Sequence, residues 1–270
     1  MVERTYRTNF AQSTISGPIR YYPSIMSLRP SMFVRALALL LVATAAKAQT
    51  IRGAVLAKRE PHHHLVYEDQ AIRVLRVSVP RHDTTLLHEH GPDYFWIALG
   101  ASTVVNAKLG APPAEITSKN LSIHYTVGKF AHVARNNALF PFNNITVELL
   151  QPQKNVHNLC EPAIADQPLD CAPPSPSTLS FSGASEHPAF STSQLRVSLM
   201  TLDPGKVMRP TTQSHGTWLI ALDTANVVSA LAFDGKAKWV GGTLKAPAGT
   251  TWSLANHGTA PLRFLTVMRP

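Results

Sequence analysis

The chain has 270 residues, of which 44% are hydrophobic, so it is long enough for one large domain or two small ones. Only 15% of the residues are charged and 21 are prolines, which favours an all-β protein with many turns over a helical bundle. The formal net charge is +9, but residues 1–48 hold six basic side chains and one acidic side chain. The remaining chain has 19 basic and 15 acidic residues, a net charge of +4. This ordinary surface balance gives no reason to expect nucleic acid as a partner.

Residues 1–48 have the pattern of a secretory signal. A basic start leads into an apolar run over residues 36–43, and Ala46-Lys47-Ala48 forms a cleavage motif before Gln49. The apolar run is too short to cross a bilayer as a permanent helix, so we expect a periplasmic or secreted protein without stable membrane insertion. An uncleaved membrane anchor is the alternative. Met26 would give this signal a better-proportioned start than Met1 does.

The stretch 151–188 is rich in proline and serine and contains both cysteines, Cys160 and Cys171. In an exported protein such a pair predicts a disulfide that closes a small loop, with two free thiols as the alternative. The stretch is too long for an ordinary loop. We therefore interpret it as a linker between a first module, 49–150, and a second module, 189–270.

The first module is expected to consist of short strands, because β-branched and apolar residues alternate between turn residues. The expected strands cover residues 72–79, 86–90, 94–99, 102–108, 121–127, 131–136 and 145–150. This density of strands is typical of a small jelly roll or barrel. The run His62-His63-His64 lies before these strands, and we interpret it as a solvated loop, with metal binding as the alternative.

His88 and His90 are the strongest functional signal. Because strand side chains alternate in direction, both imidazoles should point to one face and Glu89 to the other. Two imidazoles on one side of a strand form half of a metal site. A third histidine, His132, occurs downstream on another expected strand.

These motifs resemble those of the cupin superfamily. The first cupin motif has a small turn residue, five residues, His-x-His, three or four residues, Glu, six residues and Gly. Six residues separate Asp93 from Gly100, so Asp93 occupies the glutamate position, although the loop between His90 and Asp93 is one residue shorter than the motif's minimum. His82 occupies the opening glycine position. His132 and Asn136 match the His-x-x-x-Asn end of the second motif.

The resemblance implies two tandem cupin barrels, which are RmlC-like jelly rolls, and one divalent transition metal in the first. The implied ligands are His88, His90, Asp93 and His132, although an aspartate after Gly-Pro is also an ordinary turn residue. The candidate pocket or supporting residues are His82, Tyr94, His124, Tyr125 and Asn136. Imidazoles suit iron, copper, nickel and zinc, and an added carboxylate admits manganese. The apolar strand Phe95-Trp96-Ile97 is expected to form a dry wall.

The second half repeats the first. Residues 217–223 align with residues 94–100, Gly205 aligns with His82, and Asn256 aligns with Asn136. The ligand positions differ, because Thr211, Gln213 and Trp252 stand opposite His88, His90 and His132. We therefore expect the second module to be a degenerate cupin without a metal.

Two function classes remain open. The resemblance implies a metal-dependent oxidoreductase, most plainly a dioxygenase that acts on a small organic compound. The alternative is a module that binds a metal or a small ligand without catalysis. The resemblance also allows a homo-oligomer. The sequence contains no nucleophile elbow, phosphate loop or dinucleotide-binding fingerprint.

Overall fold

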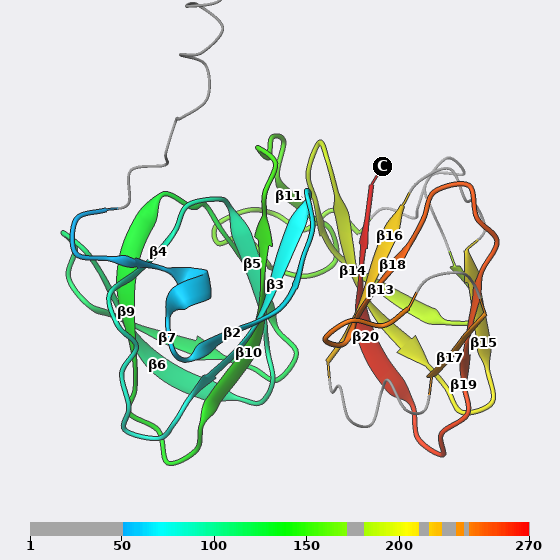
Figure 1. The fold of residues 1–270 in the computed structure, drawn as a ribbon, viewed down its shortest axis with the longest axis horizontal. Coiled ribbons are helices and arrows are strands. Elements are labelled where there is room, and N and C mark those ends of the chain that lie inside the picture. Colours follow the sequence, from blue (N-terminus) through cyan, green and yellow to red (C-terminus); the bar gives the residue numbers. More distant parts are fainter. Residues whose placement is uncertain (1–50, 172–180, 211–215, 223–230, 235–237, 270) are drawn as a thin grey trace, which may run out of the picture. The chain divides into compact units, whose positions relative to one another are not determined.

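The computed structural model describes residues 51–171, 181–210, 216–222, 231–234 and 238–269. These residues form strands and contain no α-helix, as the sequence predicted; a single 3-10 turn, η1 (Ala57–Arg59), lies beside β2. Figure 1 shows the strands of the first and second halves in separate groups, each made of two facing sheets. The described residues all belong to one compact unit.

The first module is built from two five-stranded sheets, in the orders β1-β4-β9-β6-β7 and β2-β3-β10-β5-β8. Its strands are β1 (Val55–Leu56), β2 (His63–Glu68), β3 (Ile72–Val79), β4 (His88–His90), β5 (Tyr94–Ala98), β6 (Ser102–Lys108), β7 (Ala114–Ser118), β8 (Ile123–Thr126), β9 (Phe130–Asn136) and β10 (Phe142–Leu149). Strand pairs are antiparallel except for the short parallel contact of β1 with β4.

The second module has a six-stranded sheet, β11-β13-β14-β20-β16-β18, and a four-stranded sheet, β12-β15-β19-β17. Its strands are β11 (His157–Asn158), β12 (Phe181–Ser182), β13 (Ser185–Ser191), β14 (Arg196–Leu202), β15 (Val207–Pro210), β16 (Thr217–Ala221), β17 (Leu231–Asp234), β18 (Thr243–Ala246), β19 (Ser253–Asn256) and β20 (Leu262–Met268). The order β13-β14-β20-β16-β18 repeats β2-β3-β10-β5-β8 strand for strand. The repeat predicted from the sequence is therefore present in the topology.

Two equivalent asparagines hold the same turn in the two modules. Asn136 is fully buried and donates its side-chain amide to the carbonyls of Val79 and Phe140, while its carbonyl accepts the N–H of Ala138. Asn256, also fully buried, makes the matching bonds with Leu202, Ala260 and Gly258. Both asparagines satisfy backbone groups that would otherwise be buried without partners.

The opening turns of the two motifs also match. His82 has φ 61° and Gly205 has φ 70°, so both positions adopt the left-handed conformation that glycine accepts most readily. His82 is exposed and does not line the cavity described below. Its place in the glycine position therefore reflects the backbone of the turn.

The central strand β5 divides its side chains between two environments. Phe95 and Ile97 face outward into a core that includes residues of the second module, and the Phe95 ring lies 5.4 Å from that of Phe190. Tyr94 and Trp96 face the interior of the first barrel. Of the expected dry wall Phe95-Trp96-Ile97, only Trp96 therefore borders the barrel cavity, because alternate strand residues point in opposite directions.

Part of the expected linker belongs to the second module. β11, β12 and the first half of β13 fall within residues 151–188, and β11 pairs with β13. Residues 172–180, which hold three of its prolines, lie outside the described residues, so the linker itself remains a prediction.

The predicted disulfide is wrong for this structure. Cys160 and Cys171 are free thiols. The two side chains lie beside one another, and the hydrogen bond with Cys171 raises the pKa of Cys160 to about 11. The Cys171 thiol also faces the carbonyl of Leu159 at 3.5 Å.

The signal expected over residues 1–48 lies outside the described residues, and export remains a prediction. Among the residues that the structure describes, no helix is long and apolar enough to cross a membrane.

Candidate metal centre

Three histidines come together where β4 pairs with β9. His88 lies directly opposite His132 in the antiparallel register, and His90 lies two residues along β4 on the same face. The ring centroid of His132 is 4.3 Å from that of His88 and 5.4 Å from that of His90. His88 and His90 are almost completely buried. Glu89 points away and accepts the backbone N–H of Ile51, so it is structural, as expected.

A fourth histidine, His63, enters this cluster from β2. It is 7% exposed, and one ring nitrogen from each of His63, His88 and His90 lies within 4.8 Å of the other two. Its ring centroid is 4.5 Å from that of His88. The interpretation of residues 62–64 as a solvated loop is therefore wrong for His63, because β2 pairs with β3 and carries this side chain inward.

All four imidazoles are oriented in the same way. Each Nδ1 lies against an oxygen that can only accept a hydrogen bond, so each Nδ1 carries a proton and Nε2 is the ring nitrogen left to face the cluster. The acceptors are Glu60 for His63 at 2.6 Å, the Leu86 carbonyl for His88 at 2.9 Å, Glu148 for His90 at 3.1 Å and the Asn106 side-chain oxygen for His132 at 2.6 Å. Histidines that bind metals are held by such acceptors in most known sites.

The Nε2 atoms of His88 and His132 are buried and have no hydrogen-bond partner in the described part of the chain. An unpaired buried nitrogen is costly, and a bound cation would satisfy it. Burial lowers the pKa of His88 to about 3, and burial reinforced by the neighbouring imidazoles lowers that of His132 to about 2. These side chains are therefore neutral at pH 7, which is the form that binds metals. The residues present fit a divalent transition metal.

Two buried carboxylates support the imidazoles. Glu60 accepts the His63 ring N–H together with the backbone N–H groups of His62 and Leu86. These bonds lower its pKa, although burial acts in the opposite direction. Its negative charge is therefore retained inside the protein beside the cluster.

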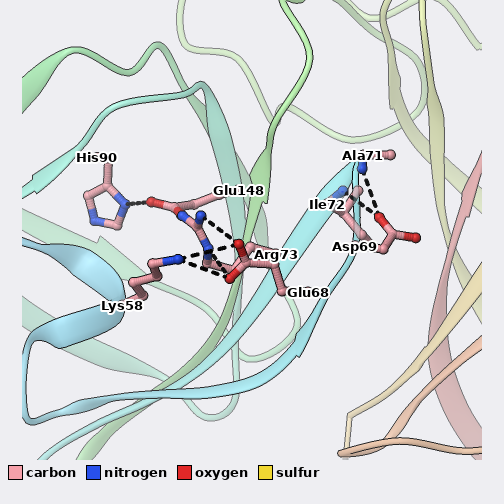
Figure 2. A network of polar contacts seen from close by, with 8 residues as sticks. All are labelled: Lys58, Glu68, Asp69, Ala71, Ile72, Arg73, His90 and Glu148. Carbon is pink, nitrogen blue, oxygen red and sulfur yellow. Dashed lines mark hydrogen bonds and ion pairs between the residues drawn. The ribbon is translucent and has the colours of Figure 1, made fainter. Parts of the chain in front are cut away.

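The second carboxylate, Glu148, belongs to a longer network (Figure 2). One of its oxygens accepts from His90 and the other from Arg73, whose guanidinium also binds Glu68. Lys58 reaches Glu68 at the exposed end of the network. Because Glu148 is bound from both sides, the orientation of His90 is fixed by residues of β3 and β10.

The four histidines line a cavity of about 160 Å³ inside the first barrel. An engineered cavity of roughly this size holds benzene. The remaining wall contains both apolar and polar side chains, and one of the polar ones, Asn106, bonds to His132. The apolar residues are Val77, Val79, Trp96, Val104, Ile116, Phe130, Ala134 and Phe142, and the polar ones are Thr85, Asn106, Lys108, Thr126, Asn144 and Thr146. Tyr94 also borders the cavity, and its ring stacks on His90 with 4.1 Å between centroids.

Asp93, predicted to be a ligand, is engaged elsewhere. One carboxylate oxygen accepts the Tyr125 hydroxyl at 2.6 Å, and the other accepts the Gly128 N–H at 2.9 Å. Asp93 does not line the cavity. A Cβ on Gly128 would lie 2.1 Å from the Pro92 carbonyl oxygen, so this turn needs glycine, and Asp93 holds it. Ligation by Asp93 would require both hydrogen bonds to break.

The other candidate residues occupy different places. His124 stacks on Trp96 at 4.2 Å and bonds to Ser122, outside the cavity lining. Tyr125 bonds to Asp93, and Asn136 holds its turn. Of the pocket candidates, Tyr94 alone borders the cavity within the described residues.

Sequence reasoning missed His63, Glu60, Glu148 and Asn106. Glu148 had a usable signal, since an acid inside the apolar strand 145–150 is unusual unless it is paired. Glu60 and His63 are three residues apart, but nothing local shows that they fold beside His88.

No protein-family model and no curated protein sequence matches the chain. Solved structures do. AerE from Microcystis aeruginosa has a TM-score of 0.50 and 13% sequence identity, with 78% of this chain and 93% of that chain covered. The vicilin of Solanum melongena also reaches 0.50, at 10% identity with 74% of each chain covered. A salicylate 1,2-dioxygenase from Pseudaminobacter salicylatoxidans reaches 0.47, at 12% identity with 75% and 72% covered.

The chain has the two-module cupin fold. At these identities the likeness establishes the fold and leaves the activity to the site itself. The first cupin module contains the histidine cluster. In the second, Trp252 takes the place of His132 and is buried in an apolar cluster. Thr211 and Gln213, which align with His88 and His90, lie outside the described residues.

Proposed function

We propose that the first cupin module holds one divalent transition metal and uses it to oxidise a small organic molecule with dioxygen. The observation that carries the proposal is the common orientation of His63, His88, His90 and His132. Each ring donates from Nδ1 to a fixed acceptor, and the buried Nε2 atoms of His88 and His132 have no partner among the described residues. A metal bound there would supply Lewis acidity and, if it is iron, copper or manganese, redox chemistry.

The residues of the chain supply the surroundings of this chemistry. Glu60, Glu148 and Asn106 hold the imidazoles in the metal-binding tautomer. Trp96 and the valines of β3 give the cavity an apolar lining that excludes water, which strengthens electrostatic interactions in the cavity.

A binding module without catalysis is the second candidate, and the number of imidazoles favours it. If His132 joins the group formed by His63, His88 and His90, the four imidazoles would complete the shell of a tetrahedral ion such as zinc and leave no position for a substrate, whereas a six-coordinate ion would keep two positions open. The identity of the metal therefore separates the two functions.

The first test is elemental analysis of the purified protein beside a His88→Ala/His90→Ala variant. We expect about one transition metal per chain in the parent and none in the variant. His64→Ala is the matched control, because His64 is the exposed neighbour of His63 and should leave the metal content unchanged. A parent that stays metal-free after loading with each candidate ion would refute the metal site.

The second test is oxygen uptake by the iron-loaded protein in the presence of single-ring organic compounds. Uptake that disappears in the double variant supports the oxidase function. If the protein binds a stoichiometric amount of metal but takes up no oxygen, the binding module is the function that remains. Export, the remaining part of the proposal, predicts a mature amino terminus at Gln49, which sequencing of the secreted or periplasmic protein would test.

A further inference from the structure

The cavity contains one permanently charged side chain, Lys108, and that residue indicates what the cavity binds. Lys108 is the last residue of β6 and lies opposite His132 in the β6–β9 register. Cross-strand partners share a face of the sheet, so its side chain starts on the same face as the histidine cluster. Its ammonium lies over the Phe130 ring, 4.4 Å from the centroid. Among the described residues, no aspartate or glutamate lines the cavity.

The ammonium of Lys108 has no carboxylate partner in the described part of the chain. The ammonium lies against the aromatic face of Phe130, and the residue is exposed. A cation held over an aromatic ring at the edge of an otherwise uncharged cavity remains available to an anion that enters.

The histidine cluster reinforces this preference. The imidazole rings themselves bring no carboxylate into the ligand set, and the carboxylates of Glu60 and Glu148 lie behind the rings of His63 and His90, outside the cavity lining. A metal in this site would therefore present positive charge to the cavity, on the same side as Lys108. The apolar part of the β3–β5–β10 wall consists of Val77 and Val79 on β3, Trp96 on β5 and Phe142 on β10, while Asn144 and Thr146 of β10 add polar groups beside it.

We propose that the cavity binds a small carboxylate whose apolar body, about the size of one six-membered ring, lies against the β3–β5–β10 wall, and that Lys108 receives the carboxylate. This inference rests on the proposed function in that the carboxylate is the substrate, or the ligand, of the same cavity. It adds the chemical class and the residue that selects it. The volume of about 160 Å³ limits the body of the molecule to roughly one ring.

The test is calorimetric titration with benzoate and with benzamide, its neutral counterpart of similar shape. Both metal-loaded protein and protein stripped with a chelator are titrated, and metal content is measured in each. We expect benzoate to bind at least tenfold more tightly than benzamide, and added salt to weaken benzoate binding selectively.

Lys108→Gln should lower benzoate affinity about tenfold, since a hydrogen bond to a charged group is lost, and leave benzamide affinity unchanged. Lys108→Arg should retain most of the preference. Lys119→Gln, an exposed lysine outside the cavity lining, is the control and should behave like the parent.

Equal affinity for the two probes, an equal effect of Lys108→Gln on both, or the absence of binding to either would overturn the inference. Failure of the metal site has a different signature. In that case no metal is retained, but the stripped protein still prefers benzoate in a manner that depends on Lys108.

Discussion

Glu60→Gln tests whether His63 is a metal ligand. The Glu60 side chain is fully buried, and its two oxygens accept three hydrogen bonds. Oε2 takes the N–H of His62 at 2.8 Å and the ring N–H of His63 at 2.6 Å, and Oε1 takes the N–H of Leu86 at 3.2 Å. Glutamine keeps the shape but replaces one of these acceptors by an NH2 group, which can only donate.

The smallest loss occurs if the amide oxygen keeps the position of Oε2. The NH2 group then faces the Leu86 N–H, and one buried donor is left unpaired, which costs about 1–3 kcal/mol of folding free energy. His63 keeps its tautomer but loses the negative charge behind it. Loss of such a supporting carboxylate typically lowers metal affinity about 10- to 100-fold. If the amide turns around, His63 must move its proton to Nε2, and the loss of affinity becomes larger.

Two measurements are needed. Competition with a chelator gives the metal dissociation constant, and urea unfolding of the metal-free protein gives the stability change. Glu115→Gln, at an exposed position of β7, controls for the removal of one negative charge. If Glu60→Gln lowers stability as expected but binds metal as tightly as Glu115→Gln does, His63 is not a ligand and the reasoning fails.

Two further predictions concern stability. The Asp69 carboxylate accepts a hydrogen bond from Lys245 at 2.7 Å. Burial acts to raise the Asp69 pKa, but this bond and those from neighbouring N–H groups outweigh burial and lower the pKa from 3.8 to about 2. The ionised Asp69 stabilises the fold by at most ~2 kcal/mol, because Lys245 is half exposed. This contribution is complete above pH 4 and is lost as the pH falls toward 2. Asp69→Asn should therefore destabilise the protein at pH 7, and the urea midpoint of the variant should change less between pH 4 and pH 2 than that of the parent. Midpoints of parent and variant that change in parallel with pH would contradict this. Asn136→Ala and Asn256→Ala should each cost about 3 kcal/mol, because several buried backbone groups lose partners. The exposed neighbour change Asn137→Ala should cost under about 0.5 kcal/mol, and similar values for all three would refute the shared turn role.

The sequence by itself determined the fold class and half of the site. Alternating apolar residues and turn residues placed β3 and β6 at their observed bounds. The pair His88 and His90 could be placed on one buried face because strand side chains alternate with a period of two. The equivalence of Asn136 and Asn256 could also be read from the repeat, since each asparagine bonds within its own turn.

Only the tertiary structure decided the rest of the site. His63 joins the cluster through the pairing of β2 with β3, and its exposed neighbour His64 has the same local composition around it. Asp93 fitted a motif position by spacing, but its carboxylate oxygens are taken by Tyr125 and Gly128, more than 30 residues away. Such choices depend on which distant groups lie within 3 Å, and residue spacing along the chain carries no information about that distance.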